Sequence, residues 1–214
     1  MIIAIDGPAG AGKSTVSERL AARLGFLRID TGALYRTIAL GAMDAGLSPT
    51  DQALQAYLDS VGIDMRSDAV FLDGVDVSSR IRMPEVSVAA SQFSAQGPVR
   101  RRLLDVQRAL ASRHDVVMDG RDIGTVVFPN ADLKIYLTAS VAARAQRRLR
   151  ELEGRGIATQ LEVVQADLEA RDRADSEREL APLRQADDAV RVDATNLTLE
   201  EVVNACFLLA RERQ

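Results

Sequence analysis

Short apolar runs alternate with helical patterns along this chain of 214 residues. Between the runs, apolar residues recur at helical spacing, as Val16, Leu20 and Leu24 do. Strands that alternate with helices predict a doubly wound α/β fold with a five-stranded, mostly parallel sheet. The runs that read as its buried strands are residues 1–5, 26–30, 116–119, 133–137 and 189–193.

Capping signals indicate where several helices begin and end. Gly25 is placed to end the first helix, and Thr198 with Glu201 predicts a capping box for the last one. Ser48-Pro49-Thr50-Asp51 resembles a second capping box with proline at the first helical position. Thr138 follows the fourth strand and is expected to cap the helix after it.

Between about residues 62 and 80, short strand-like segments without intervening helices interrupt the βα pattern. Residues 63–66 and 70–77 read as short antiparallel strands, and Asp73-Gly74 is a strong signal for a tight hairpin turn. We therefore expect a small antiparallel sheet inserted into the parallel fold.

Composition narrows the class of protein further. Apolar residues make up 47% and charged residues 27% of the chain, which is typical of globular proteins, and no apolar run is long enough to cross a membrane. The chain enters a strand at once, so we expect no signal peptide and a cytoplasmic protein. Its one cysteine, Cys206, excludes an internal disulfide and is expected to pack in the core. A net charge of −4 argues against a nucleic-acid partner.

The segment from Gly7 to Ser14 matches G-x-x-x-x-G-K-[ST], the phosphate-binding P-loop. It lies between a predicted strand and a predicted helix, as that motif requires. Lys13 would reach the outer phosphates and Ser14 would offer its hydroxyl to Mg²⁺. Lys13 and Lys134 are the only lysines among 27 basic residues, and a compact ammonium suits a crowded phosphate cradle. The alternative is a glycine-rich turn with a chance Lys-Ser.

Arginines flank a short glycine-containing segment near the C-terminal third. They are candidates for closing over transferring phosphates, with the segment acting as a hinged lid. The alternative for each cluster is a solvated basic face. The glycine-containing segment is Gly154-Arg155-Gly156. Arg144, Arg147 and Arg148 precede it, and Arg171 and Arg178 follow it, with Asp175 on the same predicted helix face as these two.

The near absence of histidine also bears on the reaction. His114 precedes a strand and is expected to be a loop residue rather than a base. A kinase acting on an alcohol usually needs a base, whereas a monophosphate acceptor is already ionised at neutral pH. Asp119 and Asp122 stay open as a base or as metal ligands.

The chain resembles the bacterial-type cytidylate kinases, members of the nucleoside monophosphate kinase family, over nearly its whole length. The Gly-Arg-Asp segment and the inserted sheet favour cytidylate over adenylate kinase. The segments that carry the resemblance are residues 5–14, 30–36, 89–92, 119–129, 171–178 and 193–198.

The resemblance implies phosphorylation of CMP and dCMP by ATP with Mg²⁺, in a monomer that binds small nucleotides and neither nucleic acid nor membranes. It implies a P-loop core, a monophosphate-binding domain that holds the inserted sheet, and a short lid. These correspond to residues 1–31, 96–145 and 179–214 for the core, 32–95 for the monophosphate-binding domain, and 146–178 for the lid with its flanking helices.

The resemblance also assigns residues to roles. ATP would contact Gly7, Pro8, Ala9, Gly10, Ala11, Gly12, Lys13, Ser14 and Thr15, with Ser14 on the metal. The catalytic set would be Lys13, Arg121, Arg147, Arg148 and Arg178. Thr31, Arg36, Arg121 and Arg178 would lie near the acceptor phosphate, Ser91, Arg100 and Asp122 near the base, and Arg171 and Asp175 near the sugar.

Other functions remain as alternatives. A GTPase-like switch is one, although the chain has no Asn-Lys-x-Asp guanine motif. Binding of nucleic acid through the arginines is another and would depend steeply on salt. Within kinases, the acceptor could instead be UMP or AMP. The sequence does not decide the CMP-to-dCMP preference or the oligomeric state.

Overall fold

The computed structural model describes residues 1–66, 69–154 and 156–213. The chain folds as two compact units, one formed by residues 1–26 and 116–214, the other by residues 27–115. The chain leaves the first unit after α1 and returns to it at β6, so the second unit is inserted between two elements of the first.

The central sheet has the strand order β2-β6-β1-β7-β8, and the strand pairs β1–β6, β1–β7 and β7–β8 are parallel. This confirms the predicted α/β fold with a five-stranded parallel sheet. β1 and β6 are almost wholly buried, which explains their continuous apolar sequences. The strands are β1 (Ile2–Asp6), β2 (Leu27–Asp30), β6 (Val116–Gly120), β7 (Leu133–Thr138) and β8 (Val190–Asp193).

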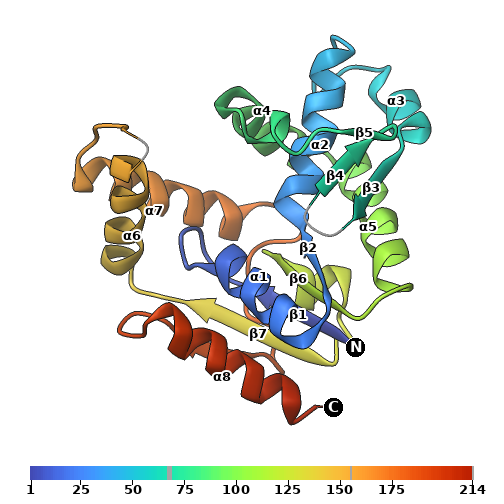
Figure 1. Ribbon diagram of the computed structural model, residues 1–214. Helices are drawn as coiled ribbons and strands as arrows, with labels where there is room; N and C mark the ends of the chain where they lie inside the picture. The colour runs from blue at the N-terminus through green and yellow to red at the C-terminus, as the bar shows by residue number, and fades with distance from the viewer. Residues whose placement is uncertain (67–68, 155, 214) are drawn as a thin grey trace. The chain divides into compact units, whose positions relative to one another are not determined.

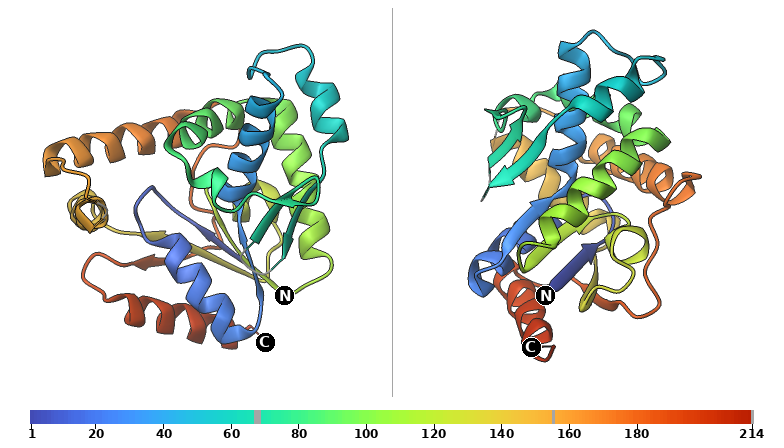
Figure 2. Two further views of the ribbon diagram at one scale, coloured as in Figure 1. Left: turned by 45° about the horizontal axis from the view of Figure 1, so that its top comes forward. Right: turned by 90° about the vertical axis from the view of Figure 1, so that its right-hand side faces the viewer.

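Helices of the first unit pack in two groups. α1 (Lys13–Leu24) and α8 (Leu199–Arg211) lie side by side against the sheet, with Val16, Leu20, Val203 and Cys206 buried in its core (Figure 1, Figure 2). α6 (Val141–Gly154) and α7 (Leu161–Glu177) pack on each other and enclose a separate small apolar cluster. None of the helices formed by the described residues is long and apolar enough to cross a membrane.

The second unit is built around α2 (Thr31–Asp44), which packs against every other helix of this unit. Its antiparallel sheet has the order β3-β4-β5, and this confirms the predicted insert. Asp73 and Gly74 have φ angles of 48° and 80°, the left-handed conformation that tight hairpins require. The remaining elements are α3 (Leu54–Ser60), β3 (Ile63–Arg66), β4 (Ala69–Leu72), β5 (Val75–Asp76), η1 (Arg80–Arg82), α4 (Pro84–Ser94) and α5 (Gly97–Ala111).

Two of the four capping predictions were right and two were wrong. Gly25 ends α1 in the left-handed conformation, and Thr198 and Glu201 form the predicted capping box. The segment that begins at Ser48 does not start a helix: the Asp51 side chain accepts from the N–H of Ala53 in a local turn, and α3 begins at Leu54. Ser140, not Thr138, accepts from the N–H of Ala143 at the start of α6.

Candidate active site

The loop between β1 and α1 is shaped by its glycines. Gly7 has φ 148°, and a Cβ at this position would lie 1.9 Å from the carbonyl oxygen of Leu137 in β7. Gly12 is the left-handed residue before α1, with φ 94°. The first N–H groups of a helix have no partner within it, so the loop directs the N-terminus of α1 toward an anion site.

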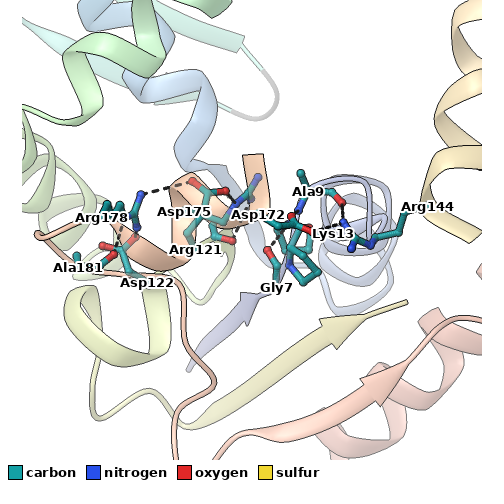
Figure 3. A network of polar contacts seen from close by, with 12 residues as sticks. Gly7, Ala9, Lys13, Arg121, Asp122, Arg144, Asp172, Asp175, Arg178 and Ala181 are labelled. Carbon is teal, nitrogen blue, oxygen red and sulfur yellow. Dashed lines mark hydrogen bonds and ion pairs between the residues drawn. The ribbon is translucent and has the colours of Figure 1, made fainter. Parts of the chain in front are cut away.

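Lys13 is folded back onto the loop that carries it. Its Nζ donates to the carbonyl oxygens of Gly7 and Pro8 at 2.7 and 2.8 Å, and the residue is only 6% exposed (Figure 3). Burial, and then the nearby Arg121 guanidinium, lower the pKa of Lys13 to about 7, although Asp119 and Asp6 oppose that shift. A bound phosphate would restore the charged form, because it adds negative charge beside the ammonium.

Asp119, at the carboxyl end of β6, is bonded to the first turn of α1. Ser14 Oγ donates to its Oδ2 at 2.9 Å, and Ser17 Oγ donates to its Oδ1 at 2.6 Å. A hydroxyl and a carboxylate beside a phosphate loop are the protein ligands that Mg²⁺ takes when phosphates and water complete its shell. These two residues therefore fit a magnesium ion, and no group of three or more His, Cys, Asp or Glu among the described residues offers a separate cation site.

Asp6 fixes the segment that follows Asp122. Its two carboxylate oxygens accept from the N–H groups of Ile123 and Gly124 at 2.8 and 2.7 Å. These residues begin η2 (Ile123–Val127), a single π-helical turn of the kind often found at functional sites. Burial raises the pKa of Asp6 to about 6 despite the two backbone hydrogen bonds.

Four charged residues alternate in sign beside the P-loop. Arg121 Nε donates to Asp175 Oδ2 at 2.6 Å, and the Arg178 guanidinium lies 3.9 Å from Asp175 and 3.5 Å from Asp122 (Figure 3). Arg178 Nε also donates to the carbonyl oxygen of Ala181. Arg178 follows the last residue of α7, so its place depends on this turn as well as on the helix. The structure thus brings together four of the candidate site residues, Arg121, Asp122, Asp175 and Arg178.

Arg171 adds to the positive charge of this region. Although the residue is exposed, partial desolvation and then the nearby Arg121 lower its pKa, and Asp175 opposes the shift. Lys13 and Arg171 are thus both held near Arg121 at a cost to their charged forms. An anion bound among these cations would relieve that cost.

The arginines of α6 have three different environments. Arg144 is 4% exposed and bonds to the P-loop, Arg147 Nη2 donates to the carbonyl oxygen of Ala194 after β8, and Arg148 pairs with Glu151 on the same helix. They do not form the single exposed face that helical spacing suggests. The predicted hinge residue Arg155 lies outside the described residues, and Gly154 is the last residue of α6.

The second unit carries the other candidates for the acceptor. Arg36 Nη2 donates to Asp30 Oδ2 at 3.3 Å, and Thr31 is buried at the start of α2. Arg100 Nη1 donates to the carbonyl oxygen of Ser94 at 3.3 Å, and its guanidinium lies 5.7 Å from the centre of the Tyr35 ring. Ser91 is exposed on α4, and His114 is an exposed residue before β6.

Sequence reasoning missed several residues that hold this site together. Asp6 precedes Gly7 at the carboxyl end of a parallel strand, and Ser17 follows Ser14 by one helical turn, so both positions gave a usable signal. Asp172 gave none, because it lies between two candidate arginines and looks like part of a surface charge run. It binds the P-loop at Ala9.

Comparisons with known proteins identify relatives of this chain. Residues 3–212 match the cytidylate kinase family model. The chain is 45% identical over 219 residues to the cytidylate kinase of Lactobacillus johnsonii, covering 100% of this chain and 95% of that protein. It is 48% identical over 219 residues to the cytidylate kinase of Syntrophotalea carbinolica, covering 100% and 93%. In fold alone, it resembles an uncharacterized protein from Eubacterium ventriosum, with a TM-score of 0.51, 10% identity, and 99% and 98% coverage.

Proposed function

The chain belongs to the cytidylate kinase family and uses ATP to phosphorylate CMP and dCMP, and we propose how its residues divide that reaction. The P-loop residues 7–15 hold the phosphates of ATP, and the cluster of Arg121, Asp122, Asp175 and Arg178 receives the acceptor nucleotide. The observation that supports this division is the position of Arg121, which is close enough to Lys13 to lower its pKa and is bonded to Asp175.

Lys13 and the arginines act on the charge of the transferring group. Lys13 exchanges the carbonyl oxygens of Gly7 and Pro8 for a phosphate oxygen when ATP binds. Arg121 and Arg178 neutralise the acceptor phosphate, and charge that develops on the equatorial oxygens is stabilised by donors already in place. Arg147 and Arg148 are proposed to join them.

No general base is required, because the nucleophile is a phosphate oxygen that is largely ionised at neutral pH. Asp119 is therefore assigned to a metal rather than to a proton. Ser14 and Asp119 would hold Mg²⁺, which supplies a positive charge that screens the phosphates of ATP from the attacking oxygen.

Recognition of the nucleoside is divided between residues of different chemistry. Asp122 accepts from the cytosine amino group, and Arg100 and Ser91 offer hydrogen bonds to the base. Arg171 and Asp175 contact the sugar, and Thr31 and Arg36 contact the acceptor phosphate. We also propose that residues 146–178 act as a lid, that residues 32–95 form the monophosphate-binding domain, and that the enzyme works as a monomer in the cytoplasm.

The decisive experiment measures ADP release with CMP, dCMP, UMP and AMP as acceptors. We expect CMP and dCMP to give kcat/KM values well above those of UMP and AMP. Faster turnover of AMP or UMP would overturn the proposed base recognition. ADP release that does not depend on any acceptor would indicate a nucleotide hydrolase. In a separate binding assay, binding to nucleic acid with a steep salt dependence would indicate that the arginines bind nucleic acid instead.

A further inference from the structure

The peptide groups on both sides of Ala9 in the P-loop are held by an ion pair between α6 and α7, two helices that lie far from the loop in the sequence. The N–H of Ala9 donates to Asp172 Oδ1 at 3.1 Å, and its carbonyl oxygen accepts from Arg144 Nη1 at 2.7 Å. Arg144 Nη1 and Asp172 Oδ2 are themselves 2.7 Å apart. Figure 3 shows this closed ring of contacts beside Lys13.

Packing reinforces the ring. Arg144 is 4% exposed, and its Nε donates to the carbonyl oxygen of Ala139, so its guanidinium is fixed. Ala9 shares an apolar cluster with Val164 and Leu168 of α7. A Cβ at Gly10 would lie only 3.4 Å from Arg144 Cβ and from Leu168 Cδ2. The loop therefore rests directly on the α6–α7 pair.

Hydrogen bonds to charged groups in a buried setting hold a backbone more tightly than neutral ones. Because Asp172 accepts from the N–H of Ala9 and Arg144 donates to its carbonyl oxygen, the peptide groups on both sides of Ala9 are held in one orientation. The ring fixes the path of the loop before the N–H groups at the start of α1, which are the groups proposed to hold ATP. A shift of about 1 Å in such donors is enough to slow a reaction severely.

Asp172 also lies within the stretch of α7 that bears acceptor candidates. It follows Arg171 directly and precedes Asp175 by three residues, so it lies less than one helical turn from either. A nucleotide that contacts Arg171 and Asp175 would therefore act on the same turn of helix that holds Ala9.

We propose that Asp172 and Arg144 are positioning residues that hold the P-loop for ATP and couple its shape to the occupancy of the acceptor site on α7. This inference rests on the proposed role of the P-loop as the ATP site. Coupling of this kind is reciprocal, so CMP should strengthen binding of an ATP analogue by the same factor as the analogue strengthens binding of CMP.

The test uses Asp172→Asn, which keeps an oxygen for the N–H of Ala9 but turns an amide donor toward Arg144. Asp167→Asn is the matched control, since it removes the same charge from an exposed position of α7. For each variant, KM for ATP, KM for CMP and kcat are measured, and the melting temperature is measured as a control for folding. In parallel, titration calorimetry measures the affinity for a non-hydrolysable ATP analogue with and without CMP.

For Asp172→Asn we expect a combined loss in kcat/KM for ATP of about 10- to 100-fold, a smaller change in KM for CMP, and a reduced effect of CMP on analogue binding. If the pair acts as a unit, the double variant Arg144→Lys/Asp172→Asn loses no more than the worse single variant. Equal kinetics and equal coupling in Asp172→Asn and Asp167→Asn would overturn the inference. If Asp172→Asn does not fold, Arg144→Lys alone decides by the same comparison.

Failure of the proposed function would look different. The wild type and Asp167→Asn would then both lack CMP-dependent turnover of ATP, whereas failure of this inference leaves both fully active and affects only the difference between the variants.

Discussion

The two units hold their candidate site residues in different ways. In the unit of residues 1–26 and 116–214, charged side chains are tied by short contacts, 2.6 Å for Arg121–Asp175 and 2.7 Å for Arg144–Asp172. In the unit of residues 27–115, Arg36 donates to Asp30 and Arg100 donates to the carbonyl oxygen of Ser94, both at 3.3 Å, and the framework is packed mainly through α2. The comparison indicates that the candidate residues of the first unit are already fixed by short contacts with one another, whereas Arg36 and Arg100 have longer hydrogen bonds to exchange for substrate oxygens.

Such a division suits a phosphoryl transfer. Preorganised donors stabilise developing charge without reorganisation during the reaction, so the phosphate loop gains most from rigidity. An arginine held by a longer hydrogen bond exchanges it for a substrate oxygen at smaller cost. The following predictions test whether charge contacts govern the first unit and packing governs the second.

Replacing Lys13 with alanine should have the largest effect. We expect kcat to fall about 100- to 1,000-fold, because the variant loses a cation beside the transferring group, while circular dichroism shows an intact fold. Lys134→Met is the matched control, since the Lys134 ammonium is paired with Asp188 and lies outside the proposed site. It should lower the melting temperature and leave kcat within a few-fold. Near-normal turnover in folded Lys13→Ala would remove this lysine from the mechanism.

Asp122→Ala should change the choice of base by about 10-fold or more. Cytosine presents an amino donor to the carboxylate, whereas uracil presents an oxygen that the carboxylate repels. Because Asp122 also pairs with Arg178, the variant should slow both substrates, and the ratio of kcat/KM for CMP to that for UMP isolates base recognition. An unchanged ratio would mean that Asp122 acts only by holding Arg178.

Gly41→Ala tests the packing of the second unit. A Cβ at Gly41 would lie 1.9 Å from the Tyr57 hydroxyl oxygen and 2.9 Å from Leu72 Cδ2. We expect a loss of about 1–3 kcal/mol in the free energy of unfolding, measured with urea, although alanine ordinarily favours a helix. Adding Tyr57→Phe should recover part of the loss, because it removes the nearest atom. A variant that is as stable as the wild type would show that α2 can move away from Tyr57.

Proton uptake on binding of an ATP analogue should be the smallest effect. The pKa of Lys13 is lowered to about 7, so at pH 8 most of this group is neutral before binding. Phosphate favours its charged form, and binding should then take up less than one proton. Calorimetry at pH 8 in two buffers with different ionisation enthalpies measures the uptake, and Lys13→Ala should abolish it. Binding heats that do not depend on the buffer would contradict the prediction.

Much of the fold could be predicted because its signals are local. The apolar runs, the Asp73-Gly74 turn and the Thr198–Glu201 box each act within a few residues. The capping box predicted at Ser48 was wrong because of another local interaction: the Asp51 side chain forms a turn that competes with the start of a helix. The P-loop could also be predicted, because the backbone path around the phosphates fixes the spacing of its glycines and lysine.

The contacts that hold the site were less accessible to sequence reasoning. Ala9 and Asp172 are 163 residues apart, and Arg144 reads as one of several arginines on a polar helix. Only the packing of α6 and α7 against the loop distinguishes Arg144, which is buried, from Arg148, which pairs on the surface. Periodicity identifies helix faces but does not say which face meets another segment.

Gly7 has a consequence for how this loop can vary during evolution. The atom that a side chain there would strike is the main-chain carbonyl oxygen of Leu137, which no change of side chain can remove. A genetic screen should therefore recover no second-site suppressor of Gly7→Ala among the neighbouring side chains. At Gly12 no atom of the described residues lies within 4 Å of an added Cβ, so within the protein the obstacle is the left-handed backbone conformation, and asparagine is the replacement that such a screen should tolerate first.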